Sequence, residues 1–247
     1  MNALPDHVAR IALSTIVRDA WRVLTFRRPS PALATHWRAY LAFGLACTWL
    51  AGIGRYWDSP RAAWWQHLGL GSLAYVIVLA LVLWLLLMPL RPARWSYRNV
   101  LVFVTLTAPP ALLYAIPVER FMPLDAAQAT NAWFLAIVAS WRVALLAWFL
   151  ARVAGLRAHV IVVATLLPIT LIVVALSLLN LEHVVFNIMA GISEEQRSPN
   201  DQAYFIVVNI AIWSVLLAPI LFIAYAVMAF NAWGAARRRA LAGRDRD

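Results

Sequence analysis

Lysine and cysteine are the residues that this sequence most lacks. All 21 basic residues are arginine, which we attribute to GC-rich codon usage of the kind found in some bacteria. Cys47 is the single cysteine and lies in an apolar segment, so a disulfide within one chain and a thiolate zinc site are both excluded. The five histidines are scattered, with no HExxH spacing. We therefore expect no metal site and no other cofactor.

Charge is also scarce, and its scarcity places the chain among membrane proteins. Only 13% of the residues are charged, 64% are hydrophobic, and the mean hydropathy is +0.75. A soluble domain is usually about 25% charged and about 45–50% apolar. The net charge of +10 does not indicate nucleic acid, because the arginines lie between apolar segments and form no single stripe. The partner that this composition predicts is the lipid bilayer.

Six apolar segments approach the length of about 20 residues that a helix needs to cross a bilayer. We therefore predict an all-α fold, a polytopic bundle of six transmembrane helices preceded by an N-terminal amphipathic interfacial helix. Residues 1–36 form a cytoplasmic amphipathic segment, residues 37–231 the six-span domain, and residues 232–247 a basic cytoplasmic tail, expected to be frayed. The predicted spans are 37–54, 68–90, 99–118, 132–151, 158–181 and 203–230.

The segment 8–26 has the pattern of an amphipathic helix. Its polar side carries Ser14, Arg18, Arg22 and Thr25. Such a helix suits the headgroup region of a bilayer, and it equally suits the cytoplasmic end of the bundle or a partner protein. The apolar side, at 100° per residue, consists of Ala12, Leu13, Ile16, Val17, Ala20, Val23 and Leu24.

The distribution of arginine predicts the orientation of the chain. Sixteen arginines lie in the terminal segments and in the loops 91–98 and 152–157, whereas four lie in the alternate loops. Because cytoplasmic loops are enriched in basic residues, we expect a multi-pass protein of a bacterial inner membrane with both termini in the cytoplasm. Arginines at both ends of the chain are expected to contact anionic lipid or a membrane-protein partner.

Arg142, at the centre of the fourth predicted span, is the strongest candidate functional residue. An arginine at this depth costs about 2.5–3.5 kcal/mol on insertion scales, so its guanidinium needs partners inside the protein. Proline interrupts several spans near the same depth. The candidate midplane site comprises Arg142, Ser140, Pro109, Pro110, Thr105, Pro168, Pro219 and Asn209.

Two interpretations of Arg142 stand side by side. Charged residues and broken helices at the midplane are the means by which many transporters build a substrate site. Alternatively, the arginine is structural and donates to the Thr105 and Leu106 carbonyls, which the prolines four residues later leave without a helical donor. Ser140 or Thr residues of neighbouring helices would be its further partners.

Enzymatic activity is not expected, because the sequence has no GxSxG, no Walker A pattern and no paired intramembrane carboxylates. We predict an integral membrane protein that acts as a scaffold, an assembly factor or a regulatory subunit. The alternative is a small transporter or channel with a midplane site around Arg142.

A third possibility comes from a resemblance. The stretches YRNVLVFVTLTAPPALLYAIP and WRVALLAWFLARVAGLRA resemble the Yip family of membrane proteins, in which a proline-bearing span precedes a helix that ends in a glycine loop. The resemblance covers about residues 97–158 and includes no diagnostic motif, and the family has five spans where six are predicted here. It implies a non-catalytic, membrane-organising protein, and no functional residue is carried over from it.

Overall fold

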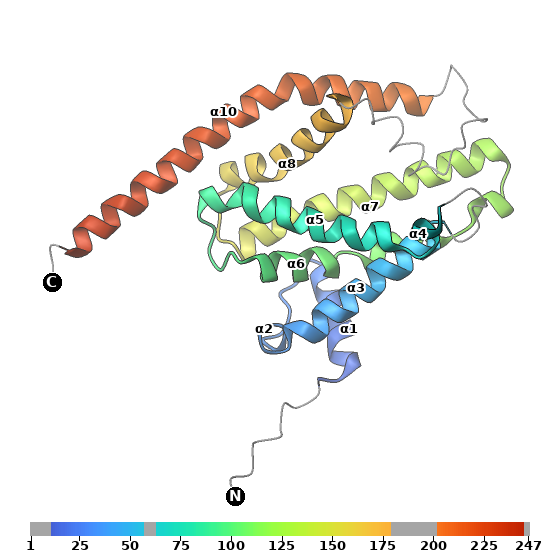
Figure 1. Cartoon of the computed structure of the whole chain (residues 1–247), viewed down its shortest axis with the longest axis horizontal. Coiled ribbons are helices and arrows are strands. Elements are labelled where there is room, and N and C mark those ends of the chain that lie inside the picture. Colours follow the sequence, from blue (N-terminus) through green and yellow to red (C-terminus); the bar gives the residue numbers. More distant parts are fainter. Residues whose placement is uncertain (1–10, 57–62, 179–201, 245–247) are drawn as a thin grey trace, which may run out of the picture.

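The computed structural model describes residues 11–56, 63–178 and 202–244, and within these ranges every regular element is a helix (Figure 1). The predicted all-α class is confirmed there. The end of the predicted fifth span and nearly all of the loop after it lie outside the described residues. The elements are α1 (Leu13–Leu24), α2 (Ala32–Thr35), α3 (Trp37–Gly54), α4 (Trp64–His67), α5 (Leu70–Leu87), η1 (Met88–Leu90), α6 (Tyr97–Leu106), η2 (Pro109–Ala115), η3 (Val118–Arg120), α7 (Leu124–Arg152), α8 (Ala158–Leu178) and α10 (Gln202–Arg244).

Four stretches of helix in the described residues are long and apolar enough to cross a membrane. A fifth is added if α6 and η2, which are bent by 44°, form one span. The chain is therefore a multi-pass helical protein with four or five candidate spans, and the predicted number of six is not confirmed. The four stretches are Leu70–Leu90, Ala129–Arg152, Ala158–Ala175 and Asn209–Arg238.

The difference in number comes from α3. This helix has the bounds predicted for the first span and is 18 residues long, but it is not among the candidate spans. Arg38, Tyr40 and Thr48 make its sequence less apolar than that of the other helices. The helix is confirmed, and its role as a span stays a prediction.

Small residues bring α3 close to α6 and η2, and the two segments run in the same direction. A Cβ atom on Gly44 would lie 2.6 Å from Thr105 Oγ1, and one on Gly54 would lie 2.4 Å from the Cβ atom of Ala115. Between these points Ala51 belongs to the same buried cluster as Ala111. Small side chains at such contacts let helix backbones approach closely.

The proline pair breaks the third predicted span instead of merely bending it. The α-helical part ends at Leu106, and a 3-10 helix begins at Pro109. Proline has no backbone N–H and its ring clashes with the preceding turn, so regular α-helix cannot continue through two consecutive prolines. In the short connection the Ala108 N–H donates to the Thr105 carbonyl at 3.0 Å.

The buried face of α1 packs against the bundle. Ile16 and Ala20 join a cluster with residues of α3 and α6, and Val23 and Leu24 join one with residues of α5, α6 and α7. The buried face of α1 is rotated relative to the predicted apolar face. The acidic residue Asp19 is fully buried, whereas several apolar residues are exposed. The exposed apolar residues lie four positions apart and are Leu13, Val17 and Trp21, with exposures of 66, 47 and 63%.

The helices α8 and α10 form an antiparallel hairpin that lies along one side of the other spans (Figure 1). The Tyr225 hydroxyl donates to the Leu86 carbonyl at 2.6 Å, and the Arg91 guanidinium lies 4.7 Å from the Trp233 ring. The helix α10 has 43 residues. At 1.5 Å per residue it is about 65 Å long, roughly twice the thickness of the hydrocarbon core. The predicted boundary at residue 232 thus lies inside a continuous helix, and the tail is helical to Arg244.

The close contact between α3 and α6 predicts the effect of one methyl group. In Gly44→Ala the new Cβ atom meets both the side chain and the backbone of Thr105 at under 3 Å. We expect this overpacking to cost about 1–3 kcal/mol and to lower the midpoint of thermal unfolding in detergent.

The matched control is Gly234→Ala in α10, where the nearest atom lies at 3.7 Å. There the midpoint should stay unchanged or rise, because alanine favours helix over glycine by about 0.5–1 kcal/mol. Equal midpoints for Gly44→Ala and the wild type would contradict the tight packing.

Candidate functional site

Arg142 lies in the second half of α7, beside the break between α6 and η2. Its side chain is half-buried, and its Nε donates to the Thr107 hydroxyl oxygen at 3.4 Å. That hydroxyl in turn donates to the Val104 carbonyl at 2.7 Å. A chain of hydrogen bonds thus links the guanidinium to the last turn of α6. This geometry holds the arginine against the broken span.

Of the partners that the sequence suggested for Arg142, the structure shows a Thr hydroxyl of a neighbouring segment, and it does not show the Thr105 carbonyl. The Thr105 carbonyl accepts the Ala108 N–H, so the proline break satisfies this oxygen within its own turn. The Thr105 hydroxyl donates to the Val102 carbonyl at 3.0 Å. The arginine therefore interacts with the side chain of the residue that follows α6, not with the carbonyl of Thr105.

A tyrosine of η2 adds a second polar group near Arg142. Tyr114 lies within electrostatic range of both Arg142 and Arg55. The Arg55 guanidinium lies 4.6 Å from the centre of the Tyr114 ring, a cation–π distance. Among the described residues Arg142 thus has the Thr107 hydroxyl as a hydrogen-bond partner and Tyr114 within electrostatic range, and it forms no ion pair with a described carboxylate.

The other predicted site residues are distributed over several elements. Pro109 and Pro110 begin η2 beside Arg142, and Thr105 is fully buried under α3. Ser140 is exposed, because it lies two residues from Arg142 and therefore on another side of α7. Three residues belong to the α8–α10 hairpin: Pro168 is buried in α8, Pro219 is exposed in α10, and Asn209 is half-buried near the start of the α10 span. None of them forms a described hydrogen bond with Arg142.

A buried polar cluster around Asp19 was missed by the sequence analysis. The Asp19 side chain is fully buried in α1. One oxygen accepts from the Tyr40 hydroxyl at 2.6 Å and from the Ser30 hydroxyl, and the other accepts from the Ser30 N–H at 3.1 Å and from Arg22 at 3.3 Å. The cluster joins α1, the loop that follows it and α3.

Four donors occupy the acceptor capacity of this carboxylate, which has about four lone-pair sites. Burial alone raises the pKa of Asp19, but the hydrogen bonds from Ser30 and Tyr40 and the charge of Arg22 outweigh it, so the pKa lies below its ordinary value. A saturated carboxylate has no free lone pair with which to take a proton from a substrate. We therefore interpret Asp19 as an anchor of the N-terminal helix and not as a catalytic base.

The signal that could have revealed the anchor is weak. Asp19 is the one acid among the apolar positions of α1, with an arginine three residues later. Its main partners lie 11 and 21 residues away, at Ser30 and Tyr40, beyond the reach of helical periodicity. No group of three or more His, Cys, Asp or Glu side chains that could hold a metal ion occurs in the described ranges.

The Asp19 anchor predicts a specific pH dependence. The pKa of Asp19 is depressed in the folded protein, so its stabilisation is present above the unfolded-chain value of about 3.9 and is lost as the pH falls through the folded value. Asp19→Asn should lower stability by about 1–3 kcal/mol at neutral pH, because an amide cannot accept from all four donors.

Thermal unfolding of both proteins in detergent between pH 3 and pH 7 checks this prediction. The wild type should lose stability more steeply than Asp19→Asn below about pH 4. Parallel pH profiles would show that another group is responsible. As a milder variant, Tyr40→Phe removes a single donor and should lie between the two in stability at neutral pH.

Comparison with known proteins identifies no relative of this chain. No protein-family model matches it, and no curated protein or solved structure is similar to it. The resemblance to the Yip family therefore stays a prediction from the two stretches that carry it. What is established is a helical, multi-pass membrane protein with four or five candidate spans.

Proposed function

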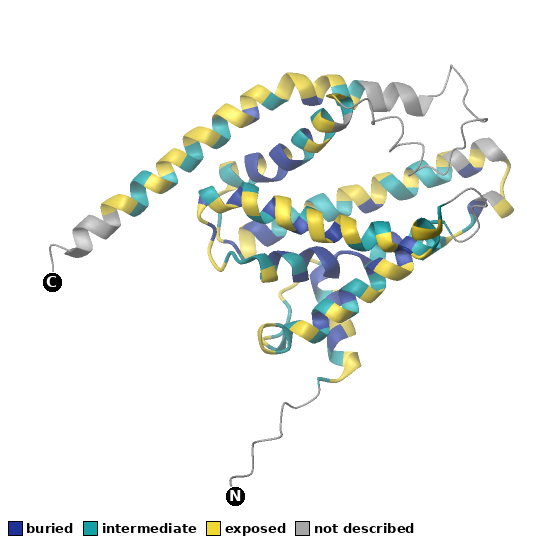
Figure 2. Ribbon diagram, viewed as in Figure 1, coloured by how far each residue is buried: buried dark blue, intermediate teal, exposed yellow. Residues whose placement is uncertain are grey.

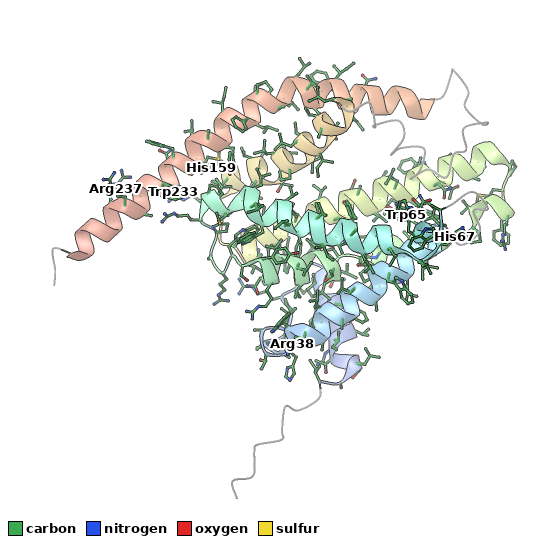
Figure 3. All side chains as sticks on the ribbon, viewed as in Figure 1. Arg38, Trp65, His67, His159, Trp233 and Arg237 are labelled. Atoms are coloured by element: carbon green, nitrogen blue, oxygen red, sulfur yellow. The ribbon has the colours of Figure 1, made fainter. Side chains whose placement is uncertain are left out.

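We propose that this chain is a non-catalytic protein of a bacterial inner membrane that acts as a scaffold, an assembly factor or a regulatory subunit of a membrane complex. In this proposal α3 is the first span and α6 with η2 the third, which brings the number of spans to six. The helix α1 lies at the cytoplasmic interface, and both termini are in the cytoplasm. Figure 3 shows Trp233 with His159 and Arg237 toward one end of the helices and Trp65 with His67 toward the other, so tryptophan lies near both ends, as in the aromatic belts of membrane proteins.

The observation that carries the proposal is the exposure of α10. Only 6% of its apolar stretch is buried, against 28–33% for the other candidate spans (Figure 2). On one side α10 packs against α8, and its own Tyr225 hydroxyl donates to the Leu86 carbonyl of α5. Ser214 and Leu221 are buried on that side, and Tyr225 and Met228 pack there.

The outer side of α10 has the residue spacing of a helix–helix contact. Large apolar side chains recur there at alternating intervals of three and four residues, as in the seam of a coiled coil. In the membrane, a second helix can pack on such a row by side-chain interdigitation. The row consists of Trp213, Leu216, Ile220, Ile223, Val227 and Phe230, with exposures between 55 and 79%. We therefore propose that a transmembrane helix of a partner protein packs on this row.

Site-specific photocrosslinking tests this role of α10. A photoreactive amino acid at Ile220 or Ile223 should give a discrete adduct with a partner protein in membranes of the native organism. At Leu221, which is 8% exposed and packs against α8, the same group should react within the chain. Lipid adducts alone at both outer positions would contradict a partner helix.

A second candidate function is transport, which the broken span favours. The bend at Pro109 and Pro110 lies beside Arg142, whose charge has no carboxylate partner among the described residues. In this second proposal the guanidinium and the hydroxyl groups of Thr107 and Tyr114 bind an anion. The bond between Arg142 and Thr107 equally supports a structural role.

Water access to position 142 distinguishes the two roles. Cys47 is the single cysteine, so Cys47→Ala followed by Arg142→Cys gives one defined thiol. If Arg142 only stabilises the broken span, a membrane-impermeant thiol reagent should not label this cysteine in inside-out membrane vesicles, in which the predicted cytoplasmic loops face the reagent. Labelling at a rate near that of an exposed control, Arg94→Cys, would favour an aqueous pathway.

A further inference from the structure

Two arginines and two aromatic residues line one open hollow of about 400 Å³. Phe26 and Arg28 come from the loop that follows α1, and Trp148 and Arg152 come from the last turns of α7. These segments are more than 100 residues apart in the sequence. A direct tie holds them together nearby, since the Trp141 indole N–H donates to the Leu24 carbonyl at 2.9 Å.

The backbone at Phe26 is unusual. Its φ is +59°, the left-handed conformation that normally falls to glycine at the end of a helix. The Phe26 N–H donates to the Val23 carbonyl and the Arg27 N–H to the Arg22 carbonyl, which is the Schellman pattern. A bulky side chain in this conformation costs about 1–2 kcal/mol. The chain thus accepts local strain at a residue whose ring lines the hollow.

The guanidinium groups of Arg28 and Arg152 are not used to close the two helices. The last carbonyls of α1 accept from Thr25, Phe26, Arg27 and Trp141. At the end of α7 the Phe149 and Leu150 carbonyls accept from backbone N–H groups. Within the described residues neither arginine forms a hydrogen bond or an ion pair, so two like charges face one hollow with their donors available.

The position of Arg28 is fixed by the Asp19 anchor. Ser30, two residues after Arg28, donates both its N–H and its hydroxyl to the buried carboxylate. On the other side, Trp148 packs against the core cluster that contains Phe103 and Phe149. Both sides of the hollow are therefore held in place by contacts within the fold, so little of the binding free energy would be spent on ordering them.

We propose that this hollow binds the phosphate group of an anionic phospholipid. Guanidinium groups bind phosphate oxygens through paired N–H donors, and the negative charge of a phosphate between the two arginines would offset their mutual repulsion. Phe26 and Trp148 offer apolar contacts for the glycerol and the upper acyl chain, as aromatic residues do at a membrane interface. Arg152 ends a candidate span, so the hollow lies where that span leaves the apolar core. The proposal does not depend on the role of α10.

Native mass spectrometry of the delipidated full-length protein in detergent tests the site. The probes are phosphatidylglycerol and zwitterionic phosphatidylcholine. We expect the wild type to prefer phosphatidylglycerol, and Arg28→Gln/Arg152→Gln to bind it about tenfold more weakly or worse, since two charge-assisted contacts are lost. The matched control is Arg27→Gln/Arg157→Gln, which removes the same charge from adjacent exposed positions outside the hollow and should bind like the wild type.

Three further outcomes decide the proposal. Equal loss of binding in both double variants would mean diffuse electrostatic attraction and would overturn it. Displacement of the lipid by millimolar inorganic phosphate would assign the hollow to a free phosphate and overturn the lipid assignment. Phe26→Gly relieves the left-handed strain while removing the aromatic wall, so thermal stability should be kept and phosphatidylglycerol affinity should fall. Unchanged affinity in this variant would count against the proposal.

Discussion

The break at Pro109 and Pro110 is the constraint around which the rest of the bundle is arranged. Backbone carbonyls that lose their helical donors are costly in an apolar environment, where no water replaces the lost bonds. The chain meets this cost locally, since the Thr105 carbonyl accepts from Ala108 in a tight turn. Because the turn changes direction by 44°, α3 must follow a bent neighbour, and residues such as Gly44 and Gly54 leave the space for it.

The same break explains how a charge is tolerated in the fourth predicted span. The Thr107 hydroxyl, which follows the last residue of α6, donates to the Val104 carbonyl and accepts from Arg142. Tyr114, on the other side of the break, lies within electrostatic range of the same guanidinium. The proline pair and Arg142 therefore both contact the short connection between α6 and η2.

The sequence alone predicted the all-α class and the positions of the long helices, because both depend on long apolar runs. It did not predict the early start of α7 at Leu124 or the continuation of α10 to Arg244. It included a Thr hydroxyl among the possible partners of Arg142, as the structure shows, but it also named the Thr105 carbonyl, which accepts from the Ala108 N–H where the 3-10 geometry replaces the helix. It also missed the anchor at Asp19, whose partners Ser30 and Tyr40 come from other segments. Helical periodicity reports the faces of one helix, whereas a buried carboxylate is explained by what the fold brings to it.

The uninterrupted length of α10 has a mechanical consequence. From the Tyr225–Leu86 contact to Arg244 the helix continues for roughly 28 Å at 1.5 Å per residue. Within this segment the Arg91 guanidinium lies against the Trp233 ring, and Arg238 marks the end of the apolar stretch. Because the helix is continuous, any change in its tilt at Trp233 would carry the last turns up to Arg244 with it.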